Sequence, residues 1–239
     1  MPAPSIHAFA EKVALITDGE NPVGRAVALQ LALQGAYVIV GFANSSEANR
    51  RAIGELQNLG TLASAVEADI STVEGAKTLV AAVEMMFGRI DLLVNCLKFS
   101  SDSTFEETAE EVFDETLNKN LKAAFFVTKE AVRLMKTRPK PKIVNVVSAL
   151  DTEDTEKNVL LAASQKSMIG LTESLAKSLP KNFRVNAVAV SEKQGRNEEL
   201  DMEMFRPKAG ISEDDTARMI LFLLSSEAVG LNGQTLKIE

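Results

Sequence analysis

The chain has 239 residues and a formal net charge of −7, and 46% of its residues are hydrophobic. This length suits one large α/β domain, and the apolar content allows a sizeable core and argues against disorder. The negative charge, with no basic cluster along the sequence, argues against nucleic acid and against an anionic membrane as partners.

Short apolar runs alternate with amphipathic stretches along the whole chain. The expected strands are Val13–Ile16, Tyr37–Val40, Leu62–Val66, Leu92–Val94, Ile143–Ser148, Val185–Val190 and Leu236–Ile238. The expected helices are Val23–Gln34, Glu47–Leu59, Val73–Phe87, a long region from Thr108 to about Lys136, Leu161–Leu179, and a last helix capped by Ser212 and ending at Leu224. This alternation predicts βαβ units, and therefore a doubly wound, Rossmann-like α/β fold with a parallel sheet, as a single domain over residues 1–239.

Several residues are expected to begin or end these helices. Gly35 is expected to end the first helix as a C′ glycine. Ser71 with Glu74, and Thr108 with Glu111, match the capping-box pattern at the starts of two further helices.

The composition also limits the location and the metal content of the protein. No apolar run reaches the roughly 18 residues that a membrane-spanning helix needs, and the first residues lack the pattern of a secretory signal. The one cysteine excludes an internal disulfide, and the one histidine, His7, argues against a zinc site. We therefore expect a cytoplasmic protein without a bound metal.

The stretch from Ile143 to Pro180 carries the strongest functional signal. It predicts a buried strand that ends at Ser148, an acidic loop Asp151–Glu156, and a long helix. In order and spacing it resembles the short-chain dehydrogenase/reductases, and within them the 3-oxoacyl-carrier-protein reductases. The resemblance covers Lys12–Ile238 through the ordered segments VALIT, GRAVALQLALQGAYVIV, EADIS, FGRIDLLVN, NKNLKAAFFVTKEAV, KIVNVVS, GLTESLAKSL, FRVNAVA and LNGQTL.

The resemblance implies a catalytic set that this chain keeps only in part. In the family a serine closes the strand, a tyrosine opens the next helix, and a lysine follows one turn later. The serine is Ser148, but the tyrosine position is Leu161 and the lysine position is Gln165. Asn120 matches the family's active-site asparagine, for which a structural hydrogen-bonding role is expected here. The chain's one tyrosine is Tyr37, far away in sequence, and loss of a general acid alone removes about 10²–10⁴-fold in rate.

The resemblance also implies a nicotinamide cofactor on a glycine-rich first turn, T-G-x-x-x-G-x-G. Here Asp18 and Pro22 stand at the first two glycine positions, and only Gly24 remains. Pro22 has no N–H to donate, and Asp18 and Glu20 place negative charge where a phosphate would bind. We favour a purely structural role for this turn over a working phosphate site.

The adenosine side of that implied site departs less from the family. The chain lacks an acidic residue after the second strand, which favours NADP(H) over NAD if a cofactor binds. An ordinary strand-to-helix loop is an equally good interpretation of that segment, and Lys98 replaces a further family glycine. The residual cofactor positions are Thr17, Gly19, Gly24, Asn44, Asp69 and Asn95, and we expect weak or absent binding.

Three functions remain open. The first is a catalytically degenerate family member kept for binding or assembly. The second is an active NADPH-dependent reductase of a carbonyl or 3-oxoacyl substrate that uses a non-standard acid, with Ser148, Lys166 or a side chain of Asp151–Glu156 as candidates. The third is a small-molecule sensor. The resemblance also implies assembly, because in the family the helices that correspond to Glu106–Lys136 and Leu161–Leu179 form a four-helix bundle between two subunits. The first region keeps apolar residues at helical spacing and the second keeps a face of small residues, so we expect a homodimer, a homotetramer or a hetero-oligomer with an active relative. The charged segment Glu192–Gly210 occupies the position of the family's substrate lid, and a solvated surface loop is the preferred interpretation.

Overall fold

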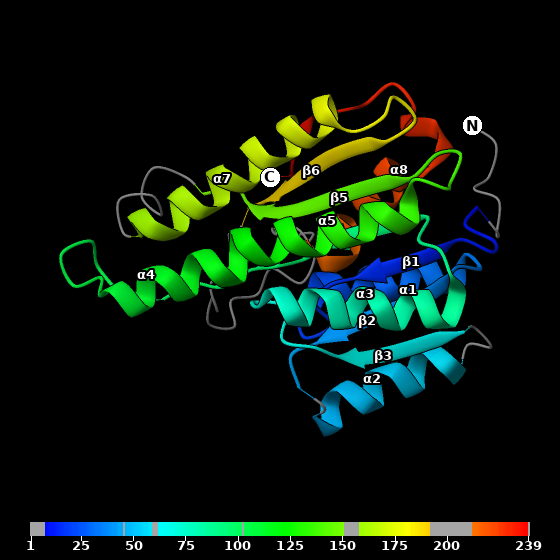
Figure 1. Cartoon of the computed structure of the whole chain (residues 1–239), viewed down its shortest axis with the longest axis horizontal. Coiled ribbons are helices and arrows are strands. Elements are labelled where there is room, and N and C mark those ends of the chain that lie inside the picture. The colour runs from blue at the N-terminus through cyan, green and yellow to red at the C-terminus, as the bar shows by residue number, and fades with distance from the viewer. Residues whose placement is uncertain are drawn as a thin grey trace, which may run out of the picture.

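A seven-stranded parallel sheet organises the part of the chain that the computed structural model describes, residues 8–44, 46–58, 62–101, 103–150, 158–191 and 212–238. The strand order is β3-β2-β1-β4-β5-β6-β7 (Figure 1). The strands are β1 (Val13–Ile16), β2 (Tyr37–Phe42), β3 (Ala63–Glu67), β4 (Leu92–Asn95), β5 (Lys142–Ser148), β6 (Arg184–Val190) and β7 (Thr235–Ile238). The predicted doubly wound α/β fold is therefore confirmed.

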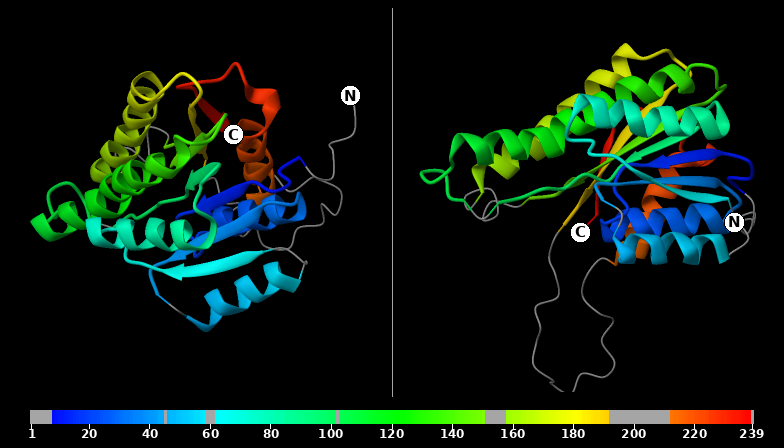
Figure 2. Two further views of the ribbon diagram at one scale, coloured as in Figure 1. Left: turned by 45° about the vertical axis from the view of Figure 1, so that its right-hand side comes forward. Right: turned by 60° about the horizontal axis from the view of Figure 1, so that its bottom comes forward.

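Helices cover both faces of this sheet, as the two further views in Figure 2 show. They are α1 (Pro22–Leu33), α2 (Glu47–Asn58), α3 (Val73–Phe87), α4 (Glu110–Leu117), α5 (Ala123–Met135), α7 (Val159–Ser178) and α8 (Glu213–Leu224), with the short turns η1 (Asn118–Lys122) and η2 (Ser226–Ala228). One face packs against α1, α2 and α8, and the other against α3, α5 and α7. The sheet is buried on both sides, which explains why its central strands are almost entirely apolar.

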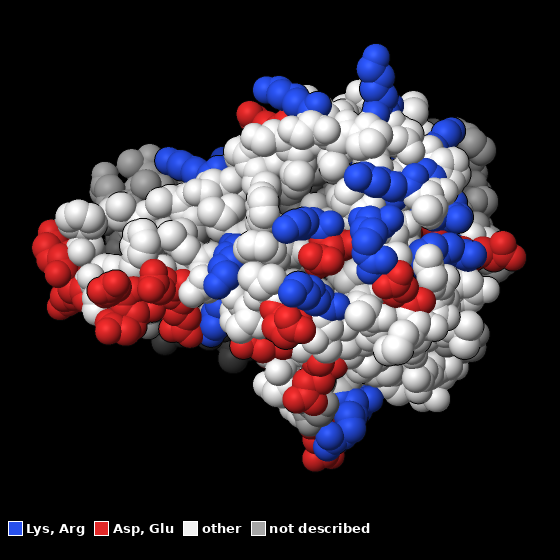
Figure 3. Space-filling view, viewed as in Figure 1, with Lys and Arg blue, Asp and Glu red and all other residues white. Residues whose placement is uncertain are grey.

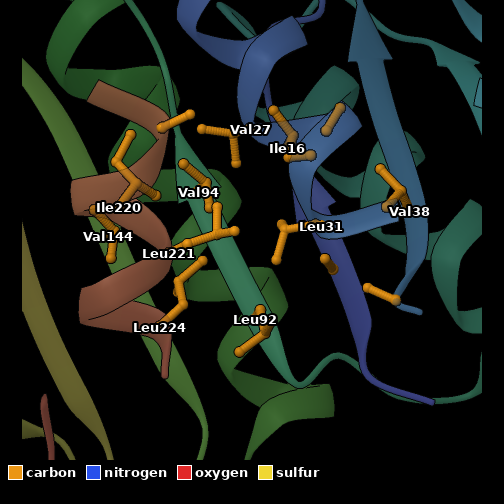
Figure 4. Close-up of a cluster of buried hydrophobic side chains, with 14 of the residues drawn as sticks. Ile16, Val27, Leu31, Val38, Leu92, Val94, Val144, Ile220, Leu221 and Leu224 are labelled. Atoms are coloured by element: carbon orange, nitrogen blue, oxygen red, sulfur yellow. The ribbon is translucent and has the colours of Figure 1, made fainter. Parts of the chain in front are cut away.

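The core between α1, α8 and the sheet shows how sequence pattern becomes packing (Figure 4). Val27 and Leu31 lie one turn apart on α1, and Ile220 and Leu224 have the same spacing on α8. These side chains meet alternate residues of the central strands, such as Val94, and are almost completely buried. The packing fixes where α1 begins, and therefore the shape of the turn that precedes it.

The sheet order reverses at the centre, because β1 pairs with β2 on one side and with β4 on the other. After β1 and β4 the chain therefore runs to opposite faces of the sheet, and the carboxyl ends of these two strands border a crevice. The candidate functional residues follow these strand ends.

Two predicted capping boxes are wrong. Thr72, not Ser71, caps α3, because the Ser71 hydroxyl donates to Asp69 Oδ1 at 2.6 Å while Thr72 Oγ1 accepts from Gly75 N. Ala109 precedes α4 without a side-chain cap, and Thr108 Oγ1 instead donates to Thr104 O.

Other helix ends follow the prediction. Gly35, with a φ of 85°, follows α1 as expected. A full capping box joins Ser212 to Asp215 at the start of α8.

The predicted long helix from Thr108 to Lys136 is not continuous. It consists of α4 and α5 joined by the π-helical turn η1. Such a turn inserts one extra residue into the helical ladder and frequently occurs at functional sites. It buries Asn120 at the carboxyl edge of the sheet.

Several predictions fall on residues outside the described part of the chain, namely His7, Asp151–Glu156 and Glu192–Gly210. Among the described helices, none is both long enough and apolar enough to cross a membrane.

Candidate functional site

Two neighbouring hollows open at the carboxyl edge of the sheet, each of about 210 Å³. The first lies between the β1–α1 turn, the end of β3 and the loop after β4. It is lined by Thr17, Asp18, Glu20, Ala43, Asp69, Ile70, Ser71, Leu97, Lys98, Phe99 and Lys119. The second lies above β5 and β6 and is lined by Asn21, Pro22, Val23, Cys96, Leu97, Lys98, Val146, Val147, Ser148, Val190 and Glu213.

The β1–α1 turn separates the two hollows, and the backbone N–H groups of Gly19, Glu20, Asn21 and Val23 already donate within the protein. Gly19 N donates to Gly41 O at 2.9 Å. Glu20 N and Asn21 N both donate to Asp18 Oδ1, at 2.8 and 3.3 Å. Val23 N donates to Asn21 Oδ1 at 2.9 Å, and Pro22 has no N–H. The Asp18 carboxylate thus sits where N–H groups of such a turn can hold a phosphate.

The two glycines of this turn are needed for packing. A Cβ at Gly19 would lie 2.2 Å from Phe42 Cε1, and a Cβ at Gly24 would lie 2.1 Å from Asp18 O. The buried Phe42 ring therefore fills the space beside Gly19, and Gly24 lets α1 begin against the backbone of Asp18. Neither position therefore tolerates a larger side chain.

Two carboxyl groups, those of Asp18 and Glu20, also lie at this turn. Burial raises the pKa of the Asp18 carboxyl above its ordinary value, although the N–H groups of Glu20 and Asn21 act in the opposite direction. Glu20 Oε1 accepts from Asn49 Nδ2 at 3.0 Å, which holds a second carboxylate beside the turn. In its present form this turn does not fit the pyrophosphate of a dinucleotide.

Asn21 fastens the turn to the loop after β4. Its Nδ2 donates to Cys96 O at 3.0 Å, while its Oδ1 caps α1. Thr17 adds a second link, because its Oγ1 accepts from Cys96 N at 3.2 Å. Cys96 itself is buried, and burial raises the pKa of its thiol, so it acts as a small apolar side chain rather than as a nucleophile.

The residues on the adenosine side lie at the rim of the first hollow. Asp69 Oδ1 accepts from Ser71 N and from Ser71 Oγ, so one of its oxygens is used locally. Asn44 is exposed, and its carbonyl accepts from Asn49 Nδ2 at 3.0 Å. Asp69 therefore faces the hollow that the turn borders, whereas Asn44 makes a contact that any loop residue could supply.

Asn95 belongs to a buried network of polar side chains between the sheet and the helices on one of its faces. Its Nδ2 donates to Thr128 Oγ1 on α5 and to Asn145 Oδ1 on β5. Asn145 Nδ2 in turn donates to Thr172 Oγ1 on α7 at 2.8 Å. These bonds tie β4 and β5 to the helices on one face, which is a structural role, although Asn95 Oδ1 makes no hydrogen bond with the described residues.

Gln165 and Leu161, which the sequence predicts at the positions of the family's lysine and tyrosine, are buried side chains, 2% and 7% exposed. Gln165 Oε1 accepts from Ser148 N at 2.9 Å, so the glutamine secures the end of β5. Its Nε2 has no hydrogen-bond partner among the described residues. Neither side chain can donate a proton to a nascent alkoxide, and neither carries a charge.

Asn120 is held by the loop after β4 and by α7. Its Oδ1 accepts from Phe99 N at 2.7 Å, and its Nδ2 donates to Phe99 O at 2.8 Å and to Ser164 Oγ at 3.0 Å. This arrangement explains the π-helical turn, because the extra residue lets Asn120 point inward and hold the loop against the helix.

Lys166, another candidate acid, and the chain's one tyrosine are both poorly placed for catalysis, and Asp151–Glu156 lies outside the described residues. Lys166 is exposed on α7, whereas its neighbour Gln165 is buried. Tyr37 opens β2 at the opposite edge of the sheet and stacks on Phe87 at 5.5 Å between ring centroids. No group of at least three His, Cys, Asp or Glu side chains that could hold a metal ion occurs among the described residues.

The sequence did not reveal two residues that shape this site. Asn21 could have been identified as the helix cap by its position before Pro22, but its bond to Cys96 O depends on the fold. Phe42 gives no sequence signal, because its effect depends on the distance between β2 and the β1–α1 turn.

Known proteins align with nearly all of this chain. The model of the short chain dehydrogenase family matches residues 12–194. The chain is 30% identical over 236 residues to a 3-oxoacyl-(acyl-carrier-protein) reductase of Staphylococcus aureus, covering 95% of this chain and 96% of that protein. It is 32% identical over 238 residues to a reductase of the same name from Thermotoga maritima, with the same coverage of 95% and 96%.

Solved structures agree with this similarity. A short-chain dehydrogenase from Burkholderia cenocepacia, solved in complex with NADP, superposes with a TM-score of 0.86 at 27% identity, covering 97% of this chain and 98% of that one. A citronellol catabolism dehydrogenase of Pseudomonas aeruginosa superposes with a TM-score of 0.83 at 28% identity, covering 97% and 95%. Because the family model matches more than half of its residues, the chain belongs to the short-chain dehydrogenase/reductase family.

Proposed function

We propose that this protein is a member of the short-chain dehydrogenase/reductase family that does not perform hydride transfer and that serves in binding or assembly. The observation that carries the proposal is the internally bonded β1–α1 turn. Asp18 accepts the N–H groups of Glu20 and Asn21, Pro22 has no N–H, and Phe42 fills the space beside Gly19. Without a phosphate site, NADP(H) binds weakly or not at all.

The catalytic positions support the same conclusion independently. A reduction needs a proton donor next to the new alkoxide, and Leu161 cannot provide one. Gln165 cannot lower a neighbouring pKa as a lysine ammonium does. Ser148 and Asn120 remain, but the backbone of Ser148 is bonded to Gln165, and Asn120 is engaged by Phe99 and Ser164.

An assay of NADPH oxidation with a 3-oxoacyl thioester tests the catalytic part of the proposal. We expect no turnover above the uncatalysed rate for the wild-type protein. Turnover by the wild type that disappears in Ser148→Ala would contradict the proposal. It would favour the alternative, an NADPH-dependent reductase of a carbonyl or 3-oxoacyl substrate, which the names of the aligned relatives support.

The assembly part rests on exposed apolar side chains along α4, η1 and α5. Phe113, Leu117, Leu121 and Phe125 follow one another at four-residue steps and form one stripe. The two phenylalanines are 46% and 45% exposed, and the two leucines are half-buried. Exposed aromatic residues in a continuous stripe are typical of an interaction surface.

The neighbouring face of α7 is made of small exposed residues, among them Ala163, Gly170 and Ser174. A Cβ at Gly170 would meet no atom within 4 Å, so this face is open to a close approach by another helix. Since α4 contacts α7, the stripe and the small-residue face form one continuous surface.

Charge along the long helix favours a second copy of this chain as the occupant. The first part, α4, carries Glu110, Glu111, Asp114 and Glu115, whereas η1 and α5 carry Lys119, Lys122, Lys129 and Arg133 against Glu130. Acidic side chains cover the α4 tip in Figure 3. A two-fold axis would place the acidic half of one helix against the basic half of the other, because isologous contacts pair each helix antiparallel with its copy.

Light scattering coupled to size-exclusion chromatography tests this interface. We expect the wild type to be a dimer or tetramer and Gly170→Glu to be a monomer. Gly54→Glu is the matched control, because Gly54 on α2 has equally open space around it and lies away from the surface. A wild-type monomer, or an unchanged mass in Gly170→Glu, would exclude this interface. Mixing with an active relative tests the hetero-oligomer in the same experiment.

A further inference from the structure

Cationic side chains from several distant segments meet at the edge of the sheet where the strands begin, opposite the two hollows. We call this surface the basic edge and define it as Lys12, Arg89, Arg138, Lys140, Lys181 and Arg184. These residues precede or open β1, β4, β5 and β6, which are adjacent in the sheet. In Figure 3, Lys and Arg side chains gather on the right-hand part of the molecule, the side on which these strands begin in Figure 1.

Three of these cations lie within ion-pair distance of the same buried carboxylate. Asp91 is 3% exposed and lies within ion-pair distance of Arg138 at 2.8 Å, Arg89 at 3.6 Å and Lys12 at 3.9 Å. Glu11 and Glu227 are the exposed carboxylates on neighbouring segments. The basic edge therefore keeps an excess of positive charge in a chain whose net charge is −7.

The lowered pKa of Lys142, which lies beneath this surface, also indicates a positive potential there. It is 7% exposed, and its Nζ donates to Ser225 O. Burial is the main cause that lowers its pKa to about 8, and Lys140, Arg184 and Lys12 lower it further. These named charges thus lie close enough together to act on one group.

The guanidinium groups of the basic edge are already engaged. Arg138 Nε donates to Asp91 Oδ1, Arg184 Nε donates to Val229 O, and Arg89 Nη2 donates to Glu11 O, each within 2.9 Å. These bonds hold the guanidinium groups against the protein and reduce the paired N–H groups that could recognise a phosphate. The ammonium groups of Lys12, Lys140 and Lys181 act instead as point charges on flexible stems, which suit carboxylate side chains on a protein surface.

The spacing of the basic edge favours an extended chain. Adjacent strands lie about 4.8 Å apart, so the starts of β1, β4, β5 and β6 extend over roughly 14 Å. In an extended peptide, alternate side chains lie about 7 Å apart on one side. Two or three acidic side chains at alternate positions would follow the row of cations.

We propose that the basic edge binds an extended acidic segment of a partner protein. The proposal is independent of cofactor binding and of the helical interface, because both lie on other parts of the molecule.

Fluorescence anisotropy with a labelled eight-residue peptide of alternating glutamate and serine tests the proposal. We expect a Kd on the order of 10 μM at low ionic strength. Binding should weaken steeply as salt is added, because the attraction is between exposed charges. The double variant Lys140→Glu with Lys181→Glu should weaken binding by about tenfold or more. A peptide with lysine in place of glutamate should not bind.

The matched control is Arg51→Glu with Lys77→Glu, which changes the net charge equally on α2 and α3. It should weaken binding by less than about twofold, because these sites lie outside the basic edge. Equal losses in both double variants, or no saturable binding, would overturn the proposal. So would tighter binding of inorganic pyrophosphate or of an oligonucleotide, because the surface would then recognise phosphate rather than acidic protein.

Discussion

Replacing Asp18 by alanine removes the carboxylate that fills the β1–α1 turn from within. In the folded protein its Oδ1 accepts from Glu20 N at 2.8 Å and from Asn21 N at 3.3 Å. The substitution frees both N–H groups and removes one negative charge beside them. Since these donors precede the N-terminus of α1, we expect Asp18→Ala to bind inorganic pyrophosphate more tightly than the wild type does.

The expected magnitude follows from the bonds that are released. A hydrogen bond to a charged group contributes about 1.5–3 kcal/mol, so two freed donors supply about 3–6 kcal/mol before any ordering cost. This corresponds to a Kd on the order of 1 mM for pyrophosphate. Loss of the internal acceptor should reduce the free energy of unfolding by about 1 kcal/mol, comparable to the loss of a helix cap.

The matched variant is Asp18→Asn, because its side-chain oxygen can still accept from Glu20 N and Asn21 N without a charge. Calorimetric titration with pyrophosphate, together with the ¹⁵N–¹H signals of Glu20 and Asn21, would measure binding in the wild type and in both variants. We expect binding and shifted signals only in Asp18→Ala. If folded Asp18→Ala does not bind, or if Asp18→Asn binds equally well, occupation of the N–H groups is not what excludes phosphate.

Three further predictions concern other residues. Gly24→Ala should lower the free energy of unfolding in urea by about 2 kcal/mol or more, because its Cβ would lie 2.1 Å from Asp18 O; an unchanged midpoint would contradict the packing. Lys142 has its pKa lowered to about 8 in the folded state, so unfolding takes up a proton between about pH 8 and pH 10, and stability should rise with pH in that window. Lys142→Met should remove this rise. Denaturant unfolding of the variant and of the wild type across this pH range would measure the difference in unfolding free energy. Parallel pH profiles of the two proteins would contradict the prediction. Leu161→Tyr combined with Gln165→Lys should not restore NADPH oxidation, because the cofactor turn is unchanged; recovered turnover would show that the turn is functional.

The architecture could be predicted from the sequence, because the alternation of apolar residues in strands and their helical spacing in helices depend only on residues close together in the chain. Each predicted strand is present, and so is each predicted helix except the long one, which is divided into α4 and α5; most boundaries differ by one or two residues. The errors occur where side chains compete for partners. Ser71 matched the capping pattern, but the carboxylate of Asp69 holds its hydroxyl, and Thr72 caps α3 instead. The π-helical turn at Asn120 was not foreseen either, since it depends on contacts with Phe99 and Ser164.

The candidate site was predictable in its residue types but not in its bonds. The sequence shows that Asp18 and Pro22 replace glycines, yet only the fold shows that Asp18 accepts two N–H groups and that Phe42 covers Gly19. The basic edge had no sequence signal, because its cations are separated by long segments and gather only when β1, β4, β5 and β6 align.

This chain keeps the family fold, and we propose that the chain itself closes the cofactor turn. Calorimetric titration of the wild-type protein with NADPH, and separately with NADH, would test this closure. The internally bonded turn predicts no saturable binding with either cofactor at concentrations up to about 100 μM, whereas micromolar affinity would require about −8 kcal/mol. Saturable binding of either cofactor with a micromolar Kd would contradict the claim.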